Sequence, residues 1–180
     1  MKELSLNILD VTKNSVTAGA SEIGISLFED VDGWLTLKIS DNGCGMSEET
    51  QKRVIDPFYT TRTTRKVGLG LPLLKMAAEQ TGGTMNIISS TEKGKSGTVI
   101  EAKFDTNSID FMPIGDIIST VCILIAGSPM IDFVFADVSP LHNVELKTSE
   151  LKAVLGEEIS LSEPEIQQWI KEYLKEQYTS

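Results

Sequence analysis

Three side chains with oxygen ligands recur at helical spacing near the start of the chain. Residues 2–18 have the period of an α-helix, and Asn7, Asp10 and Asn14 fall within one arc of about 60° on its wheel. Amide and carboxylate oxygens are ligands that Mg²⁺ prefers, so the stripe indicates a cation site. The alternative is a polar stripe that only faces solvent, and the stripe alone does not separate the two.

A glycine segment, Asp41-Asn-Gly-Cys-Gly-Met46, follows a predicted strand and precedes a predicted helix. Gly43 and Gly45 allow the backbone to approach a flat ligand and to adopt positive φ. Asp41 at the strand end can accept a hydrogen bond from an exocyclic amine. The alternative is a tight turn without a ligand.

A second glycine segment, Lys66-Val-Gly-Leu-Gly-Leu71, opens a predicted helix. Backbone N–H groups at a helix N-terminus form a general anion site. Arg62, Arg65 and Lys66 are placed to meet phosphate charge, and the alternative for each is a solvated cation on a loop. The spacing is not that of a dinucleotide-binding fold, because Leu73 stands where a third glycine would be needed.

The hydrophobic pattern predicts the elements that hold these segments. Alternating Ile and Leu residues are typical of half-buried strands, and apolar residues three and four apart are typical of amphipathic helices. Ser47 is suited to cap a short helix that follows it. In residues 1–105 we expect helices over 2–18 and 70–81, and strands over 22–28, 34–40, 84–90 and 97–104.

The second part of the chain differs in charge. Residues 106–180 carry 12 acidic and 4 basic side chains, a net charge of −8. We therefore expect two domains, 1–105 and 106–180, the second being an acidic α/β extension packed on the first. Its last helix carries Trp169 and Tyr173 on an apolar face that either covers a core or binds a partner. The expected elements are helices over 113–126, 148–155 and 164–177, and strands over 130–137 and 144–146.

Taken in order, the segments resemble the boxes of the GHKL ATPases, a superfamily that includes histidine-kinase catalytic domains, gyrase B, Hsp90 and MutL. The resemblance covers residues 1–105 and implies an α/β (α+β) fold of the Bergerat type, a two-layer sandwich in which ATP lies between helices and a mixed sheet. The matching segments are 10–20 (N box), 41–45 (G1 box), 56–62 (F box), 68–71 (G2 box) and Gly97-Thr98.

The resemblance also implies roles for individual residues. Asn14 would ligate a Mg²⁺ that bridges the phosphates, and Asp41 would bind the adenine amine. Asp10 stands where ATP-hydrolysing members usually have Glu, which makes it the candidate catalytic residue with a shorter reach. The nucleotide-binding set that we expect comprises Asn7, Asn14, Asp41, Gly43, Gly45, Met46, Phe58, Thr60, Thr61, Arg62, Lys66, Gly68, Leu69, Gly70, Leu71 and Thr98.

Composition excludes several other classes of protein. A net charge of −10 disfavours a nucleic-acid surface, and 41% hydrophobic residues exclude a mostly disordered chain. The longest apolar run, 121–126, is too short to cross a membrane. Cys44 and Cys122 lie far apart, and we expect both thiols to be buried and reduced, which indicates the cytoplasm.

The predicted function is ATP binding with Mg²⁺ by a protein that acts on a separate protein partner. Histidine kinases carry a helical hairpin with a phospho-acceptor histidine ahead of this domain, and no such hairpin fits before the N box. The only histidine, His142, is expected to lie on the surface. We expect a kinase or regulator working in trans. The alternatives are a nucleotide-sensing binding module without phosphotransfer, or a slow ATPase.

Overall fold

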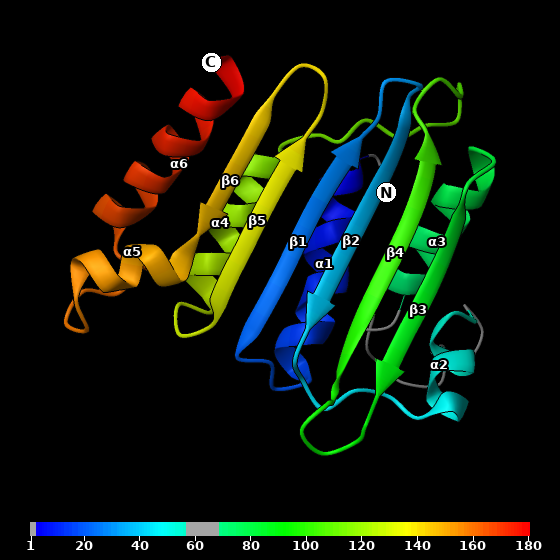
Figure 1. Ribbon diagram of the computed structural model, residues 1–180, viewed down its shortest axis with the longest axis horizontal. Helices are drawn as coiled ribbons and strands as arrows, with labels where there is room; N and C mark the ends of the chain where they lie inside the picture. The colour runs from blue at the N-terminus through cyan, green and yellow to red at the C-terminus, as the bar shows by residue number, and fades with distance from the viewer. Residues whose placement is uncertain (1–2, 57–68) are drawn as a thin grey trace.

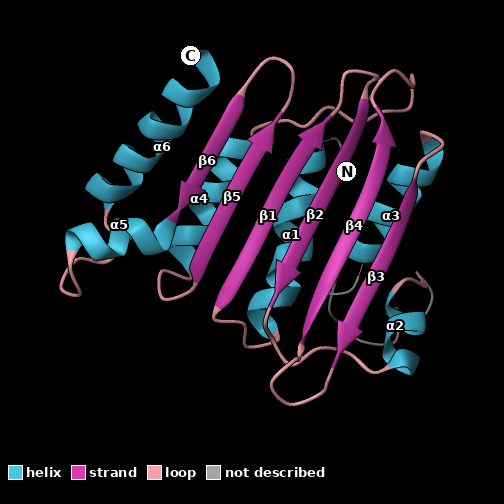
Figure 2. Ribbon diagram, in the orientation of Figure 1, coloured by secondary structure: helices cyan, strands magenta, loops and turns pink. Residues whose placement is uncertain are grey.

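The computed structural model describes residues 3–56 and 69–180, and these form a helical layer on one six-stranded mixed sheet (Figures 1 and 2). The strand order is β3-β4-β2-β1-β5-β6; β1 and β5 pair in parallel and the other neighbours are antiparallel. The predicted α/β sandwich with a mixed sheet is confirmed. The strands are β1 (Glu22–Glu29), β2 (Trp34–Asp41), β3 (Thr84–Ser90), β4 (Gly97–Asp105), β5 (Asp132–Val138) and β6 (Asn143–Lys147).

Helices cover one face of the sheet. Behind it in Figure 1 lie α1 (Leu4–Thr17), α3 (Gly70–Gln80) and α4 (Ile117–Gly127). The other described helices are α2 (Glu48–Val54), α5 (Thr148–Leu155) and α6 (Pro164–Thr179). Ser47 caps α2 by accepting a hydrogen bond from the Thr50 backbone N–H, as its residue type predicts.

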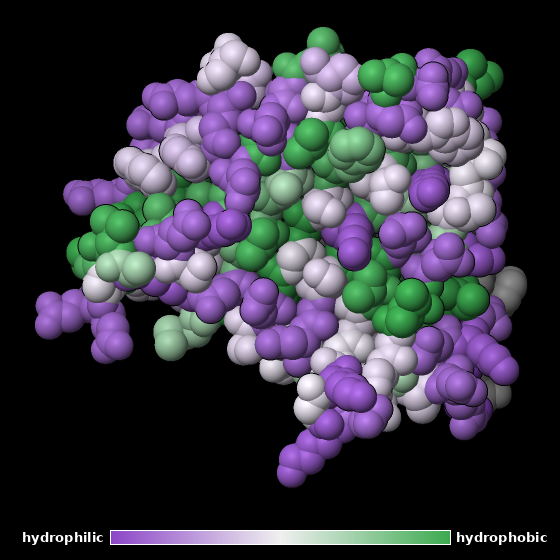
Figure 3. Space-filling model, viewed as in Figure 1, coloured by the Kyte–Doolittle hydropathy of each residue, from purple (hydrophilic) through white to green (hydrophobic). Residues whose placement is uncertain are grey.

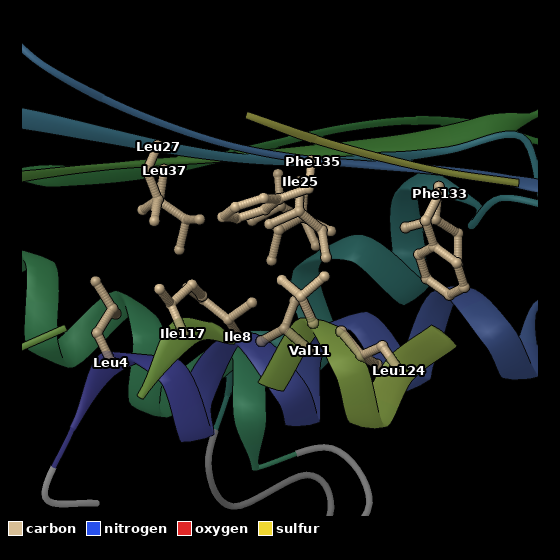
Figure 4. Packing of buried hydrophobic residues seen from close by; sticks show 14 of the residues in the cluster. Leu4, Ile8, Val11, Ile25, Leu27, Leu37, Ile117, Leu124, Phe133 and Phe135 are labelled. Carbon is tan, nitrogen blue, oxygen red and sulfur yellow. The ribbon is translucent and has the colours of Figure 1, made fainter. Parts of the chain in front are cut away.

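The core lies between the helices and the sheet because period-2 and period-3.6 apolar patterns face each other. Every second strand residue points towards the helices, and the apolar arc of α1 faces these strand side chains. Figure 4 shows these side chains meeting in one layer. Those with at most 3% exposure include Leu4, Ile8, Val11, Ile25, Leu27, Leu37, Phe133 and Phe135.

The other face of the sheet is mostly uncovered. Figure 3 shows polar and small side chains there, interspersed with apolar ones. Such a division is usual for sheets that bury one face only.

The acidic part of the chain continues the same sheet. β5 lies next to β1, with Ile25 opposite Phe135 in the register, and β6 follows as the edge strand. α6 packs against α4 and β6 through the fully buried Ile170 and Leu174. The division of the chain into domains at residue 105 stays a prediction.

The helix predicted from residue 113 begins at Ile117 instead. Gly115 has φ +78°, outside the helical region, and Asp116 caps the helix by accepting a hydrogen bond from the Ser119 N–H. The carbonyls of Pro113 and Ile114 accept hydrogen bonds from the first two N–H groups of α1. These residues thus cap α1 rather than extend α4.

Two other expectations about side chains are wrong. Cys44 is exposed and Cys122 is only half-buried. His142 is not an ordinary surface residue, because its Nε2 lies 2.9 Å from the carboxylate of the buried Asp137.

Tyr178 donates a hydrogen bond to the same Asp137 carboxylate. Burial is the main cause that raises the pKa of the Tyr178 hydroxyl, and this hydrogen bond is the next.

The apolar face of α6 divides between two environments. Ile170 is fully buried, whereas Trp169 and Tyr173 are 47% and 37% exposed and stack on each other with ring centroids 5.0 Å apart. The expectation that this face covers a core is therefore met by Ile170, but not by the exposed Trp169 and Tyr173.

Candidate functional site

A cavity of about 260 Å³ opens between α1 and the sheet at the carboxyl end of β2. Apolar surface dominates the described part of its lining, and Asp41 is the one charged residue among the described residues there. The structure brings six of the predicted nucleotide-binding residues together around this cavity: Asn14, Asp41, Gly45, Met46, Leu71 and Thr98. Ser15, Ala18, Val54 and Ile100 complete the lining and were not predicted.

Hydrogen bonds on both oxygens hold the Asp41 carboxylate in place. Ser15 Oγ donates to Oδ2 at 2.5 Å, and the backbone N–H of Gly43 donates to Oδ1 at 2.9 Å. A carboxylate oxygen has two lone pairs, so each oxygen keeps acceptor capacity. Asp41 is therefore a fixed hydrogen-bond acceptor in a mainly apolar cavity, a combination that selects a ligand with a donor at its edge.

The glycines after Asp41 allow close packing within the protein. A Cβ on Gly45, which has φ +74°, would lie 1.8 Å from the carbonyl oxygen of Ser90. A Cβ on Gly43 would lie 2.8 Å from the Ala18 side chain. Their missing side chains let the loop lie against β3 and the end of α1. Gly45 has the positive φ that its type allows, and the prediction that these glycines serve approach to a ligand stays a prediction.

A network of polar groups around Ser89 holds Met46 and Thr98, two residues of the cavity lining. The Ser89 and Thr98 hydroxyls lie 2.7 Å apart, and the Met46 N–H donates to Ser89 Oγ at 2.8 Å. Gln51 Nε2 donates to the carbonyls of Met46 and Ser89. Sequence analysis did not predict Ser89 or Gln51, since neither belongs to a recognisable motif.

The N-terminus of α3 packs against α1 beside the cavity. Asn7 is fully buried and its Nδ2 donates to the carbonyl of Gly70 at 3.0 Å. A Cβ on Gly70 would lie 3.3 Å from Val11 Cγ2, slightly tighter than usual, so glycine eases the close approach of the two helices. The Asn7 side-chain oxygen is buried without a hydrogen-bond partner among the described residues.

A second, larger cavity of about 620 Å³ lies on the other side of Asn14. Asp10, Lys13 and Gly70 line it together with residues of α4. Asn14 is half-buried and lines both cavities, and its side chain makes no hydrogen bond to a described residue. The two cavities thus meet at the Asn14 amide, with Asp10 one helical turn away.

Leu69 is the N-cap residue of α3 and is 37% exposed. Six further predicted residues lie outside the described residues: Phe58, Thr60, Thr61, Arg62, Lys66 and Gly68. Asp56, which opens the predicted F box, is described and exposed. No helix in the described ranges has the length and hydropathy that crossing a bilayer requires.

Solved structures share this fold. The ADP-bound MutL ATPase domain of Aquifex aeolicus superimposes with a TM-score of 0.55 over 86% of this chain and 68% of that one, at 14% identity. The N-terminal domain of a DNA repair protein gives a TM-score of 0.59 over 82% of this chain and 52% of that one, at 13% identity.

Curated relatives match part of the chain. The signal transduction histidine-protein kinase AtoS of Escherichia coli is 32% identical over 56% of this chain and 16% of its own length. The sensor histidine kinase YxdK of Bacillus subtilis is 34% identical over 53% of this chain and 31% of its own length. This chain thus spans less than a third of either relative. The family model described as histidine kinase-, DNA gyrase B- and HSP90-like ATPase matches residues 1–108, and the chain belongs to that family.

Proposed function

We propose that the protein binds Mg-ATP, with adenine in the 260 Å³ cavity and its exocyclic amine on Asp41. The observation that carries this proposal is the fixed Asp41 carboxylate, the one charged group among the described lining residues of a mainly apolar cavity. The cavity is below the range of about 300–1,000 Å³ that is common for whole ligands, so it suits a base rather than a complete nucleotide. The ribose and phosphates then extend past Asn14.

The residues beyond Asn14 suit a triphosphate with its metal ion. Among the described residues, the Asn14 side chain has no hydrogen-bond partner, and neither has the buried Asn7 side-chain oxygen. Oxygen donors of this kind, together with waters and phosphates, match the preference of Mg²⁺. The metal would supply charge neutralisation at the phosphates. The first turn of α3 would add its N-terminal dipole.

Asp10 lies where it can act on a group that approaches the phosphates from solvent. Its side chain is exposed and lines the second cavity, one turn before Asn14. A carboxylate there can accept a hydrogen bond from an incoming hydroxyl, imidazole or water and orient it. We propose that the incoming group belongs to a separate protein and that the chain acts as a kinase or regulator of that partner, as the sensor-kinase relatives suggest.

Calorimetric titration with Mg-ATP and Mg-GTP tests nucleotide binding. We expect saturable one-to-one binding of Mg-ATP and much weaker binding of Mg-GTP, because the guanine 6-oxo group would face the Asp41 carboxylate. The variant Glu101→Gln removes a carboxylate from β4, outside the cavity, and should bind like the native chain. Absence of heat and of thermal stabilisation with millimolar Mg-ATP would refute the proposal.

Labelled ATP distinguishes the possible outputs. Transfer of the γ-phosphate to an added candidate partner supports a kinase, and steady release of phosphate from the protein alone supports a slow ATPase. Binding without either reaction, together with altered partner affinity, supports a nucleotide sensor.

A further inference from the structure

Three turns at one end of the sheet expose apolar side chains almost completely. Val31 in the β1–β2 turn is 87% exposed, Leu141 in the β5–β6 turn is 88% exposed, and Ile109 after β4 is 99% exposed. Single exposed apolar residues are ordinary, but three at one sheet end form a group that needs an explanation. Figure 3 shows apolar side chains projecting along the upper edge, where Figure 1 places these turns.

The strand order places the turns in a row. β1 and β5 are neighbours, so the β1–β2 and β5–β6 turns are centred two strands apart, which is about 10 Å. Asn107 Nδ2 donates to the carbonyl of Asp32, which holds the chain just before Ile109 against the β1–β2 turn. Two turns of an α-helix rise about 10.8 Å, so a helix across the strand ends can offer apolar residues seven apart to Val31 and Leu141.

Internal hydrogen bonds hold all three turns in shape. Asp30 Oδ1, just before Val31, accepts from the N–H groups of Asp32 and Trp34, which follow it. Ser139 Oγ accepts from the Leu141 N–H, and the Ser108 carbonyl accepts from the Phe111 N–H beyond Ile109. Preorganised tips lose little conformational entropy when they bind, which favours docking.

Acidic side chains flank two of the three tips. They lie beside Val31 and Ile109 in the sequence and at the adjoining ends of β1 and β4. The acidic residues at this end are Glu29, Asp30, Asp32, Asp105 and Asp110. Within the described ranges, none of them forms an ion pair. Lys103 is the basic residue that the register brings towards this end on β4. The Val31 and Ile109 tips are thus set in a negative field, with Leu141 at the end of the row.

We propose that this sheet end, with Val31, Ile109 and Leu141 as anchors, docks a basic amphipathic helix of a partner protein. Charge selects among the possible occupants. A second copy would bring another acidic end and a net charge of −10, and an anionic membrane would be repelled in the same way. The surface lies away from both cavities, so this proposal does not depend on nucleotide binding.

The test uses an 18-residue helical peptide of Leu and Lys with one apolar face, measured by fluorescence anisotropy. We expect the triple variant Val31→Ser, Ile109→Ser, Leu141→Ser to bind it at least about tenfold more weakly than the native chain, as loss of interface anchors does. The matched control, Ile88→Ser, Met130→Ser, Val154→Ser, removes side chains that are 72%, 89% and 85% exposed elsewhere. It should bind within about twofold of native.

Two more peptides and two assays complete the test. A Leu/Glu peptide with the same pattern, and a Leu/Lys peptide scrambled to lack an apolar face, should both bind poorly. Equal loss in both triple variants, unchanged binding in the first, or equal binding of the Leu/Glu peptide would overturn the proposal. A native dimer that only the first triple variant dissociates, or binding to anionic vesicles that this variant abolishes, would also overturn it, since the occupant would then be a second copy or a membrane.

Discussion

Replacing Asp41 by Asn tests the site most directly, because it changes one atom of the carboxylate and leaves its shape. Oδ1 can still accept the Gly43 N–H, and the new amide N–H₂ can donate to Ser15 Oγ in place of the present bond. We therefore expect the fold to tolerate the change, with urea unfolding that differs little from native. What changes is the group presented to the cavity, an N–H₂ donor in place of an oxygen acceptor.

The expected loss follows from the hydrogen bond that ATP would make. A bond to a charged partner is worth about 1.5–3 kcal/mol, so Mg-ATP affinity should fall by about 10- to 150-fold. The affinity for Mg-GTP should stay the same or rise, because the guanine 6-oxo group then meets a hydrogen-bond donor. The ratio of ATP to GTP affinity is consequently a sharper measurement than either affinity alone.

Calorimetry with both nucleotides on the native chain, Asp41→Asn and Glu101→Gln gives that ratio. Ser15→Ala is an intermediate case, since it frees one carboxylate oxygen without removing charge, and it should weaken ATP binding only several-fold. An Asp41→Asn variant that folds and keeps the native preference for ATP would show that Asp41 does not read the base.

Four other variants give independent tests. Asn14→Ala should weaken nucleotide binding in Mg²⁺ yet change it little in EDTA, as titration in both buffers would show. Asp10→Asn should keep binding and lower any transfer or hydrolysis rate by about 10²- to 10⁴-fold in assays with labelled ATP. Gly45→Ala should destabilise the chain by several kcal/mol in urea unfolding, or abolish folding, because its Cβ would overlap the last carbonyl of β3. Tyr178→Phe leaves the buried Asp137 short of a donor and should cost about 1.5–3 kcal/mol in urea unfolding. The folded-state pKa of Tyr178 is raised above its ordinary value of 10.0. The stability difference between the native chain and Tyr178→Phe should therefore be full below pH 10 and disappear as the pH rises further.

Local pattern was enough to predict most elements. Alternation in segments such as Ile23, Ile25 and Leu27 depends only on neighbouring residues, and the structure has strands at all six predicted places. The start of α4 could not be predicted, since Pro113 suggests a helix start while Gly115 and its positive φ end that possibility in the folded chain. Helix propensity alone does not decide between the start signal of Pro113 and the interruption at Gly115.

Contacts between distant residues account for what sequence reasoning missed in the site. Ser15 lies on the apolar arc of α1, and its hydroxyl gains a role only because the fold brings Asp41, 26 residues later, against it. Ser89 and Gln51 are likewise defined by partners on other elements. A motif search finds Asp41 because its glycine neighbours are distinctive, whereas the residues that position a motif have ordinary types.

The acidic part of the chain, residues 106–180, helps to position helix α1. The first turn of α1 has N–H groups without partners in its own helix, and the carbonyls of Pro113 and Ile114 accept those of Leu4 and Ser5, each at 2.8 Å. α4 then packs along α1 and forms one wall of the cavity that Asp10 lines. Since Asp10 and Asn14 lie on that same rigid helix, residues after 105 help to set where both side chains stand relative to the sheet. A family match that ends at residue 108 therefore describes the motif residues but omits part of what holds them in place.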